Sequence, residues 1–341
     1  MESIRLSLGP FQGITDAPFR NVFKRHFGGI DKFYTPFFTG IQKDHAKNLQ
    51  VEEIDPAYND VKTLTPQILS TDATEILRFA VQCKELGYQE INLNMGCPFP
   101  RVANKKRGCG LLPYPEKIDA MLSTVFERID MKFSIKCRLG YFSPDEIVPV
   151  IDIFNQFPLS ELIIHPRIGK QLYKGEADVK HFAELIPRIK APLVYNGDIV
   201  SVESFERIQE QVKPVNEFML GRGLLANPFL AEEIKHHLWG TLSEGASFVG
   251  TDVTKLTPLT GCPKPQRLHA FVVELYEDRL RHAGGSPKVL GRVKELWSYL
   301  MYSFDEPQDI WRKIKKINAL KEYEEAVETV FREHVLVRNE E

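Results

Sequence analysis

The sequence predicts an α/β fold, a (β/α)8 TIM barrel followed by a small all-α helical domain. Two observations lead to this prediction. Short apolar runs alternate with amphipathic helical segments through about the first 240 residues. From about Gln266 onward the pattern is helical, with no strand signal. The 341 residues are sufficient for a barrel of about 250 residues and a smaller second domain.

Eight β-rich runs are spaced as the strands of such a barrel. They are Arg5–Gln12, Lys32–Phe38, Thr63–Leu69, Glu90–Met95, Lys132–Arg138, Glu161–His165, Pro192–Asn196 and Glu217–Gly221. The alternative is a doubly wound sheet. It is less well supported, because no GxGxxG motif follows the first run.

Helical periodicity fills most of the intervals between these runs. The predicted helices are Asp72–Leu86, Pro115–Arg128, Pro144–Phe157, Asp178–Ile189, Ser201–Val212 and Pro228–Leu238. Asp72, Asp178 and Ser201 are suitable N-caps, and Pro115 and Pro144 suit a first helical turn. Between the first and third strands the pattern is less regular and does not fix the positions of the helices.

The chain is expected to divide into three parts. Residues 1–240 form the barrel domain, and residues 241–263, rich in Gly, Thr, Ser and Pro, form a linker. Residues 264–341 form the helical domain, with helical patterns at Arg267–His282, Lys288–Tyr302 and Ile310–Phe331.

Composition excludes several classes of protein. Hydrophobic residues make up 43% and charged residues 26% of the chain, no apolar run is long enough to span a membrane, and the N-terminus has no signal-peptide pattern. Five scattered cysteines without a CxxC pair indicate a reduced, cytoplasmic protein rather than a disulfide scaffold or a metal site.

Charge is unevenly distributed although the net charge is only −2. Residues 264–321 contain 12 lysines and arginines against 7 acidic residues, and residues 322–341 contain 2 against 7. Solvated helix faces explain such a pattern, and so does a contact surface for a polyanion.

The segment Glu90–Pro98 is the most informative stretch of the chain. Asn92 and Asn94 alternate with apolar residues along a strand, which ends at Gly96-Cys97-Pro98. This pattern places a thiol at the end of a strand, beside amides that can bind a planar polar ligand.

Five further strand ends carry polar groups, as expected of a barrel whose active site lies at the carboxyl ends of its strands. These groups are Gln67, Lys136 with Arg138, His165, Asn196 with Asp198, and Gly221 with Arg222. A lysine in an apolar strand indicates function, because lysine is seldom buried without a partner. The glycine-arginine pair after the eighth strand suits a phosphate.

Each of these residues also has a simpler interpretation. Gln67 could satisfy backbone groups, His165 could be a core histidine, and Asn196-Gly197-Asp198 could be an ordinary turn. Cys109, between two glycines, competes with Cys97 for the chemical role, although it could be a small packing residue. No GxSxG motif supports hydrolase chemistry.

Taken together and in order, these motifs resemble the tRNA-dihydrouridine synthase family, flavin-dependent enzymes that reduce uridines in tRNA. The resemblance covers nearly the whole chain. It is based on Gly9–Asp16, Asn92–Pro98, Gly108–Leu112, Lys136–Arg138, His165–Asp178, Asn196–Ile199 and Leu220–Pro228. The first motif departs from the usual Ala-Pro-Met-Ala-Gly at Gly9, Phe11 and Gln12, which affects the expected packing against the flavin ring.

The resemblance implies FMN as cofactor and NADPH as reductant. Pro10 and Phe11 would lie against the flavin ring, and Gln67, Lys136 and His165 would hydrogen-bond its polar edge. The residues implied for the ribityl chain and phosphate are Asn196, Asp198, Gly221 and Arg222.

The resemblance also implies the substrate contacts and the reaction. Asn94, Arg138 and Tyr173 would contact the target uracil, while Cys97 would protonate its C5 after hydride transfer from the flavin to C6. The resemblance also implies that the polyanion contacted by the basic segment is tRNA. Lys288, Arg292 and Lys294 are among the basic residues that would contact it.

The implied protein is a cytoplasmic monomer without metal, acting on tRNA. The segment Gly291–Leu300 resembles the sequence of the C-type bacterial subfamily. This similarity favours position 16 of the tRNA D-loop as the uridine that is reduced. Two rival functions remain at this point: a small-molecule flavin oxidoreductase on the same barrel, such as a dihydroorotate or dihydropyrimidine dehydrogenase, and a tRNA-binding protein without catalysis.

Overall fold

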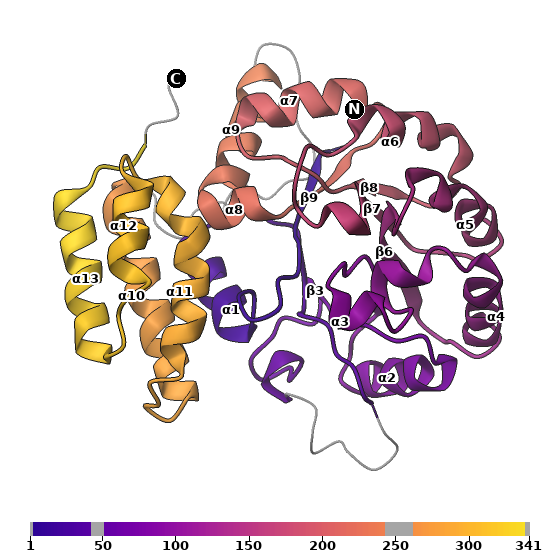
Figure 1. The fold of residues 1–341 in the computed structure, drawn as a ribbon, viewed down its shortest axis with the longest axis horizontal. Coiled ribbons are helices and arrows are strands. Elements are labelled where there is room, and N and C mark those ends of the chain that lie inside the picture. Colours follow the sequence, from indigo (N-terminus) through magenta and orange to yellow (C-terminus); the bar gives the residue numbers. More distant parts are fainter. Residues whose placement is uncertain (1–2, 42–50, 243–261, 338–341) are drawn as a thin grey trace. The chain divides into compact units, whose positions relative to one another are not determined.

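The structure is a computed structural model that describes residues 3–41, 51–242 and 262–337 (Figure 1). Most of the predicted linker, residues 241–263, falls outside these ranges. Contacts divide the chain into two compact units. The barrel unit comprises residues 1–10, 31–198 and 206–220, and the helical unit comprises residues 11–30, 199–205 and 221–341.

All named strands belong to the barrel unit. They are β1 (Arg5–Leu8), β2 (Lys32–Tyr34), β3 (Leu64–Thr65), β4 (Gln67–Ile68), β5 (Glu90–Met95), β6 (Lys132–Gly140), β7 (Leu162–Ile168), β8 (Leu193–Tyr195) and β9 (Glu217–Leu220). Each paired strand is parallel to its neighbour, in the order β3-β2-β1-β9-β8-β7-β6-β5-β4. The predicted barrel is therefore confirmed.

The described residues contain nine strands where eight were predicted, because Pro66 divides the third. Proline has no N–H for the ladder, so Leu64–Thr65 pairs with β2 and Gln67–Ile68 pairs with β5. These two pieces are the ends of the sheet order and adjoin in the sequence. A bridge from Phe38 to Ile68 brings the chain beyond β2 onto β4 and nearly closes the barrel.

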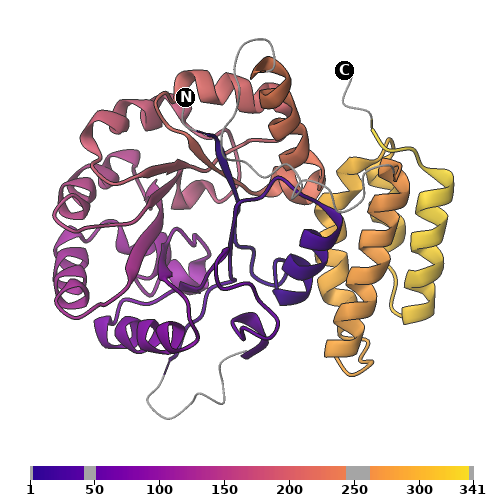
Figure 2. The same ribbon diagram turned by 180° about the vertical axis from the view of Figure 1, so that it is seen from behind.

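Helices surround the strands of the barrel unit, as Figure 2 shows from behind. They are α2 (Ala73–Glu85), α3 (Pro100–Ala103), α4 (Pro115–Phe126), α5 (Ile147–Phe154) and α6 (Val179–Leu185), while α7 (Val202–Gln211) spans both units. Short 3-10 turns are η1 (Val51–Glu53), η2 (Gly108–Leu111), η3 (Pro144–Glu146), η4 (Gly169–Gln171) and η5 (Ile186–Arg188).

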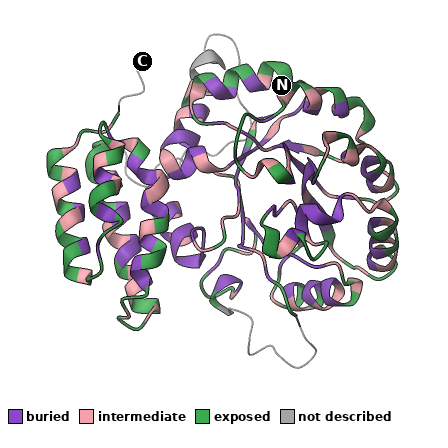
Figure 3. Cartoon of the chain, viewed as in Figure 1, coloured by how far each residue is buried: buried purple, intermediate pink, exposed green. Residues whose placement is uncertain are grey.

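Burial follows the pattern expected of a barrel. The strands are buried along most of their length, and the surrounding helices are buried on one face and exposed on the other (Figure 3). Tyr34, Ile163, Val194 and Met219, on β2, β7, β8 and β9, form a buried apolar cluster. Polar groups nearer the carboxyl ends are buried as well, and these form the candidate site.

The helical unit is built from helices. They are α1 (Ala17–His26), α8 (Arg222–Ala226), α9 (Leu230–Leu242), α10 (Lys264–His282), α11 (Val289–Leu300), η7 (Met301–Ser303), α12 (Pro307–Ile314) and α13 (Leu320–Glu333). Helix α1 packs on α10 through Phe19, Phe23 and Phe271. No helix in the described part of the chain is long and apolar enough to cross a membrane.

The helices differ from the prediction at several points, and the short helices α3 and α8 were not predicted. Helix α1 was not predicted, although Asp16 caps it by accepting a hydrogen bond from the Phe19 N–H, and Pro18 lies in its first turn. The single predicted pattern Ile310–Phe331 is two helices, α12 and α13. Ala319 is extended between them, and the Asn318 N–H donates to the Glu322 carboxylate instead of continuing a helix.

Candidate functional site

Polar side chains gather at the carboxyl ends of successive strands in the barrel unit. Gln67 lies on β4, Asn94 on β5, Lys136 on β6 and His165 on β7, while Asn196 directly follows β8. Strands β4 to β8 are consecutive neighbours in the sheet, so these side chains share one end of the barrel.

Buried amides form a continuous hydrogen-bonded chain across three of these strands. Asn92 Nδ2 donates to Ser134 Oγ at 2.9 Å, Gln67 Nε2 donates to Asn92 Oδ1 at 2.8 Å, and Asn94 Nδ2 donates to Gln67 Oε1 at 2.8 Å. Gln67, Asn92 and Ser134 are fully buried. Because each amide fixes the orientation of the next, the chain holds Asn94 in one rotamer.

Asn94 in turn holds the cysteine turn that follows β5. Its Oδ1 accepts hydrogen bonds from the N–H groups of Gly96 at 3.0 Å and Cys97 at 2.9 Å. Burial raises the pKa of the Cys97 thiol, although the Phe99 backbone, Arg101 and Arg138 oppose this effect. The thiol therefore stays protonated at neutral pH and can give up a proton.

Cys109 lies behind this turn. Its N–H and Sγ both donate to the Cys97 carbonyl, at 3.2 and 3.3 Å, and burial raises its pKa to about 12. Gly108, with φ of 56°, lets the two segments approach, because a Cβ there would lie 2.5 Å from the Cys97 carbonyl oxygen. Cys109 thus supports the turn that carries Cys97.

Lys136 contributes a cation to the same end of the barrel. Its Nζ donates to Asn196 Oδ1 at 2.7 Å, and Asn196 Nδ2 donates to the Met219 carbonyl at 2.8 Å. Burial, together with the charge of Arg138, lowers the pKa of Lys136 to about 8. An ammonium has three donors and the bond to Asn196 uses one of them, so the group can bind an additional acceptor.

Arg138 is buried and held by backbone carbonyls. Its Nε donates to Gly96 at 3.1 Å, and its Nη1 donates to Ile168 at 3.0 Å and to Leu172 at 2.7 Å. The guanidinium carbon lies 5.3 Å from the centre of the Tyr173 ring, a cation–π distance. The structure therefore brings together Arg138 and Tyr173, two of the residues predicted from the sequence to contact the substrate.

Sequence reasoning missed Arg167, which connects two predicted residues. Its Nη1 lies 2.9 Å from His165 Nε2, and its Nη2 donates to Asp198 Oδ2 at 2.6 Å. Asp198 has a positive φ of 40° and also accepts the Ala177 N–H at 2.8 Å. The two-residue period of a strand was the available signal, since it places Arg167 on the same face as His165.

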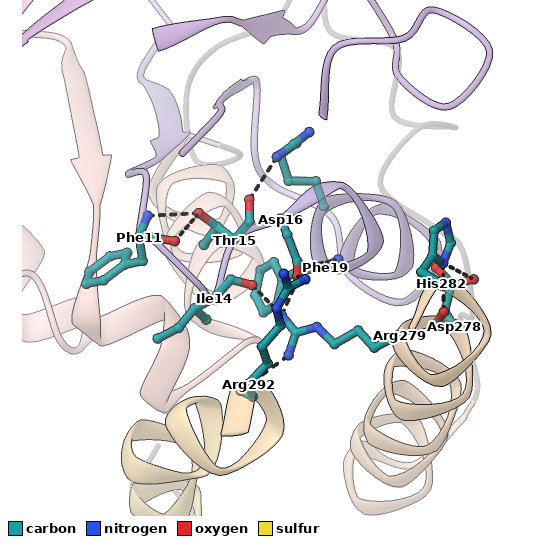
Figure 4. A network of polar contacts seen from close by, with 10 residues as sticks. Phe11, Ile14, Thr15, Asp16, Phe19, Asp278, Arg279, His282 and Arg292 are labelled. Carbon is teal, nitrogen blue, oxygen red and sulfur yellow. Dashed lines mark hydrogen bonds and ion pairs between the residues drawn. The ribbon is translucent and has the colours of Figure 1, made fainter. Parts of the chain in front are cut away.

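Phe11, in the helical unit, belongs to a loop fixed by an ion network (Figure 4). The Phe11 N–H donates to Thr15 Oγ1 at 2.8 Å, and Arg279 Nη2 donates to the Ile14 carbonyl at 2.5 Å and to Asp16 Oδ1 at 2.9 Å. Asp16 also pairs with Arg292 at 3.1 Å. Pro10 precedes this loop in the sequence, two residues after β1, and belongs to the barrel unit.

Gly221 and Arg222 follow β9 and begin helix α8 in the helical unit. A Cβ at Gly223, one residue later, would lie 2.1 Å from the Ile199 carbonyl oxygen, so this turn requires glycine. Arg222 lines an open cavity of about 1510 Å³ within the helical unit. Lys264, Tyr299 and Tyr302 line it as well, so the cavity offers cations and aromatic rings.

The basic residues predicted to contact tRNA lie at the start of α11. Lys288 and Arg292 are exposed and Lys294 is half-buried. Arg292 is the one that the structure ties to the loop network, through Asp16.

One group in the described residues has metal-ligand spacing. Glu306, Asp309 and His334 offer ligand atoms within 4.8 Å of one another. Asp309 also pairs with Lys313 at 3.0 Å and His334 with Asp305 at 3.4 Å. Ion pairs account for this group, and we assign no metal to it.

Comparison with known proteins gives the family. The model of the dihydrouridine synthase (Dus) family matches residues 7–264. The tRNA-dihydrouridine synthase B of Pasteurella multocida is 29% identical over 227 residues, 66% of this chain and 67% of its own length. A probable tRNA-dihydrouridine synthase 1 of Synechocystis is 30% identical over 234 residues, 68% of this chain and 64% of its own length.

A third relative matches over more of the chain. The tRNA-dihydrouridine(16) synthase of Neisseria meningitidis serogroup A is 24% identical over 323 residues, which cover 93% of this chain and 91% of that protein. The family match begins within β1 and includes the other described strands and the cysteine turn after β5. The chain belongs to the dihydrouridine synthase family.

Proposed function

We propose that this protein reduces specific uridines of tRNA to 5,6-dihydrouridine, with FMN as bound cofactor and NADPH as reductant. Its membership of the family supports the reaction, and the names of its relatives support tRNA as the substrate. The observation that carries the proposal is the cysteine turn. Cys97 is a buried, protonated thiol fixed by Asn94, at the barrel end where Lys136 and Arg138 also lie.

The residues at this end of the barrel fit a flavin. The pyrimidine edge of an isoalloxazine presents carbonyl oxygens and ring nitrogens, and Gln67, Lys136 and His165 offer an amide, an ammonium and an imidazole on strands β4, β6 and β7. Pro10 and Phe11 would lie against the ring. Asn196, Asp198, Gly221 and Arg222 would hold the ribityl chain and phosphate.

When bound and reduced by NADPH, the flavin supplies the hydride that C6 of the uracil receives. The chain's own part is to hold the base and to deliver a proton. Asn94, Arg138 and Tyr173 would position the uracil, and Cys97 would protonate C5. A buried thiol with a raised pKa suits an acid that starts protonated at neutral pH.

We assign tRNA binding to the helical region, residues 264–341, with residues 1–240 as the catalytic domain. Lys288, Arg292 and Lys294 would contact phosphates. Position 16 is the proposed target. Supporting this choice, the relative named for position 16 matches over 93% of the chain, including the helical region.

The test is a reconstituted reaction. Purified protein, FMN and NADPH are incubated with an unmodified tRNA transcript, and dihydrouridine is mapped by mass spectrometry of nuclease fragments. We expect dihydrouridine at position 16, and a transcript with cytidine at that position should remain unreduced. Oxidation of NADPH by free uridine or orotate, without any product in tRNA, would instead support a small-molecule oxidoreductase.

A further inference from the structure

We propose that Arg167 fixes the ring tautomer of His165, with the single ring proton on Nδ1. Arg167 acts through His165 and is therefore a positioning residue. The inference about the tautomer depends only on the contacts within the barrel unit, while its consequence for the flavin rests on the proposed function.

The geometry places the two side chains together by strand periodicity. His165 and Arg167 are two residues apart on β7 and so point to the same face. Both are nearly fully buried, with exposures of 8% and 2%. Arg167 Nη1 lies 2.9 Å from His165 Nε2, which is an ordinary hydrogen-bond distance.

The chemistry of the pair determines which nitrogen carries the proton. A guanidinium has five N–H donors, no acceptor, and does not lose a proton in proteins. The bond therefore requires Nε2 to accept, which excludes both the Nε2–H tautomer and the imidazolium ion. The single ring proton must be on Nδ1.

Arg167 cannot easily turn away from this contact. Its Nη2 donates to the Asp198 carboxylate at 2.6 Å and to the Gly175 carbonyl at 2.6 Å. Asp198 also accepts the Ala177 N–H, so the carboxylate is held by two donors, one on β7 and one on the loop that follows it. The guanidinium is thus held on one side and presents Nη1 to the histidine on the other.

A defined tautomer has a consequence for the ligand. An Nδ1–H donor matches an acceptor such as a flavin carbonyl oxygen or a deprotonated ring nitrogen, and the opposite tautomer would meet that acceptor with a lone pair. Arg167 would therefore strengthen flavin binding without touching the flavin.

The tautomer can be measured directly. The full chain is labelled with 15N-histidine, and two-bond nitrogen–proton correlations distinguish a protonated ring nitrogen from an unprotonated one. Of the nine histidines, the signal of His165 is the one lost in His165→Asn. We expect His165 to show protonated Nδ1 and unprotonated Nε2 at neutral pH, before any flavin is added. A protonated Nε2 would overturn the proposal.

Variants separate this role from simple packing. Arg167→Met removes the donor, so His165 should shift toward the Nε2–H tautomer. Arg167→Lys supplies another group that only donates, and it should retain the wild-type tautomer. Arg20→Met is the matched control, because Arg20 is also buried but its Nη1 donates to the Thr15 carbonyl, so the His165 signal should not change. An unchanged tautomer in a folded Arg167→Met protein would refute the role.

If Arg167→Met fails to fold, the wild-type and Arg167→Lys spectra still decide the question. Titration with FMN then tests the consequence: affinity should fall about tenfold in Arg167→Met and recover in part in Arg167→Lys. Wild-type protein that binds no FMN would contradict the proposed function and leave the tautomer assignment standing. Equal FMN affinity in wild type and Arg167→Met would contradict the consequence alone.

Discussion

The ion network around Asp16 should be energetically coupled. The Asp16 and Arg279 side chains are 5% and 1% exposed and lie 2.9 Å apart, so neither charge has water to replace a lost partner. Asp16→Asn keeps an oxygen that can cap α1 but leaves the buried Arg279 charge without a carboxylate partner. We expect a loss of about 3 kcal/mol in the free energy of unfolding, the lower end for a broken buried pair.

Arg279→Met should cost less than this. It removes charge-assisted bonds to Asp16 and the Ile14 carbonyl, worth about 2 kcal/mol. Asp16 keeps Arg292 and the Phe19 N–H as partners. In the double variant no unpaired buried charge remains, so the total loss should be about 3 kcal/mol rather than the sum of the two single losses. The coupling energy is then about 2 kcal/mol.

Urea unfolding followed by tryptophan fluorescence measures these losses in the unit that contains the network. All three tryptophans of the chain, at 239, 297 and 311, belong to the helical unit, and Trp297 is buried against Tyr323. Arg292→Met is the control. Its side chain is 56% exposed, so its loss should cost under about 1 kcal/mol. If the loss in the double variant equals the sum of the two single losses to within about 0.5 kcal/mol, the two residues are not coupled and the reasoning is refuted.

Three further predictions concern the site. Because the pKa of Lys136 is lowered to about 8, its ammonium is present at neutral pH and is lost as the pH rises. FMN affinity, measured by fluorescence, should therefore fall above about pH 8 in the wild type and stay level in Lys136→Arg. A level profile in the wild type would contradict this. Gly108→Ala would place a Cβ 2.5 Å from the Cys97 carbonyl oxygen, so dihydrouridine formation should fall at least tenfold with FMN still bound. Gly87→Ala is the control, because Gly87 also has a positive φ, of 92°, but its nearest neighbour is 4.0 Å away, so this variant should lose stability alone. Equal activities of the two variants would disprove a role for the contact between Gly108 and Cys97. Arg222→Ala should reduce the fraction of protein purified with flavin, and unchanged occupancy would remove Arg222 from the phosphate site.

Strand-end chemistry is the part of the site that the sequence predicts well. Alternation along β5 and β6 sets the faces of Asn94, Lys136 and Arg138 directly, because the side-chain period of a strand is two. In a barrel, successive strands then bring those residues to one end. Pattern alone was therefore sufficient for the fold and for the neighbourhood of Cys97.

Features that depend on partners distant in the sequence could not be predicted in this way. Strand periodicity places Arg167 on the same face as His165, but the bond from its guanidinium to Asp198, 31 residues away, has no local signal. Helix α1 is a different case, because Asp16 as N-cap and Phe19, Val22 and Phe23 at helical spacing are local signals for it. The network joining Asp16 to Arg279 spans 263 positions of the sequence, and no local signal marks it.

Cys97 as the proton donor is the central claim, and Cys97→Ala tests it most directly. With FMN, NADPH and a tRNA transcript, this variant should bind flavin and oxidise NADPH like the wild type while dihydrouridine formation falls by about two to four orders of magnitude, the usual contribution of a positioned acid. Cys109→Ala is the matched comparison and should retain most of the product. Wild-type product yield from Cys97→Ala would contradict the account and move the acid role elsewhere.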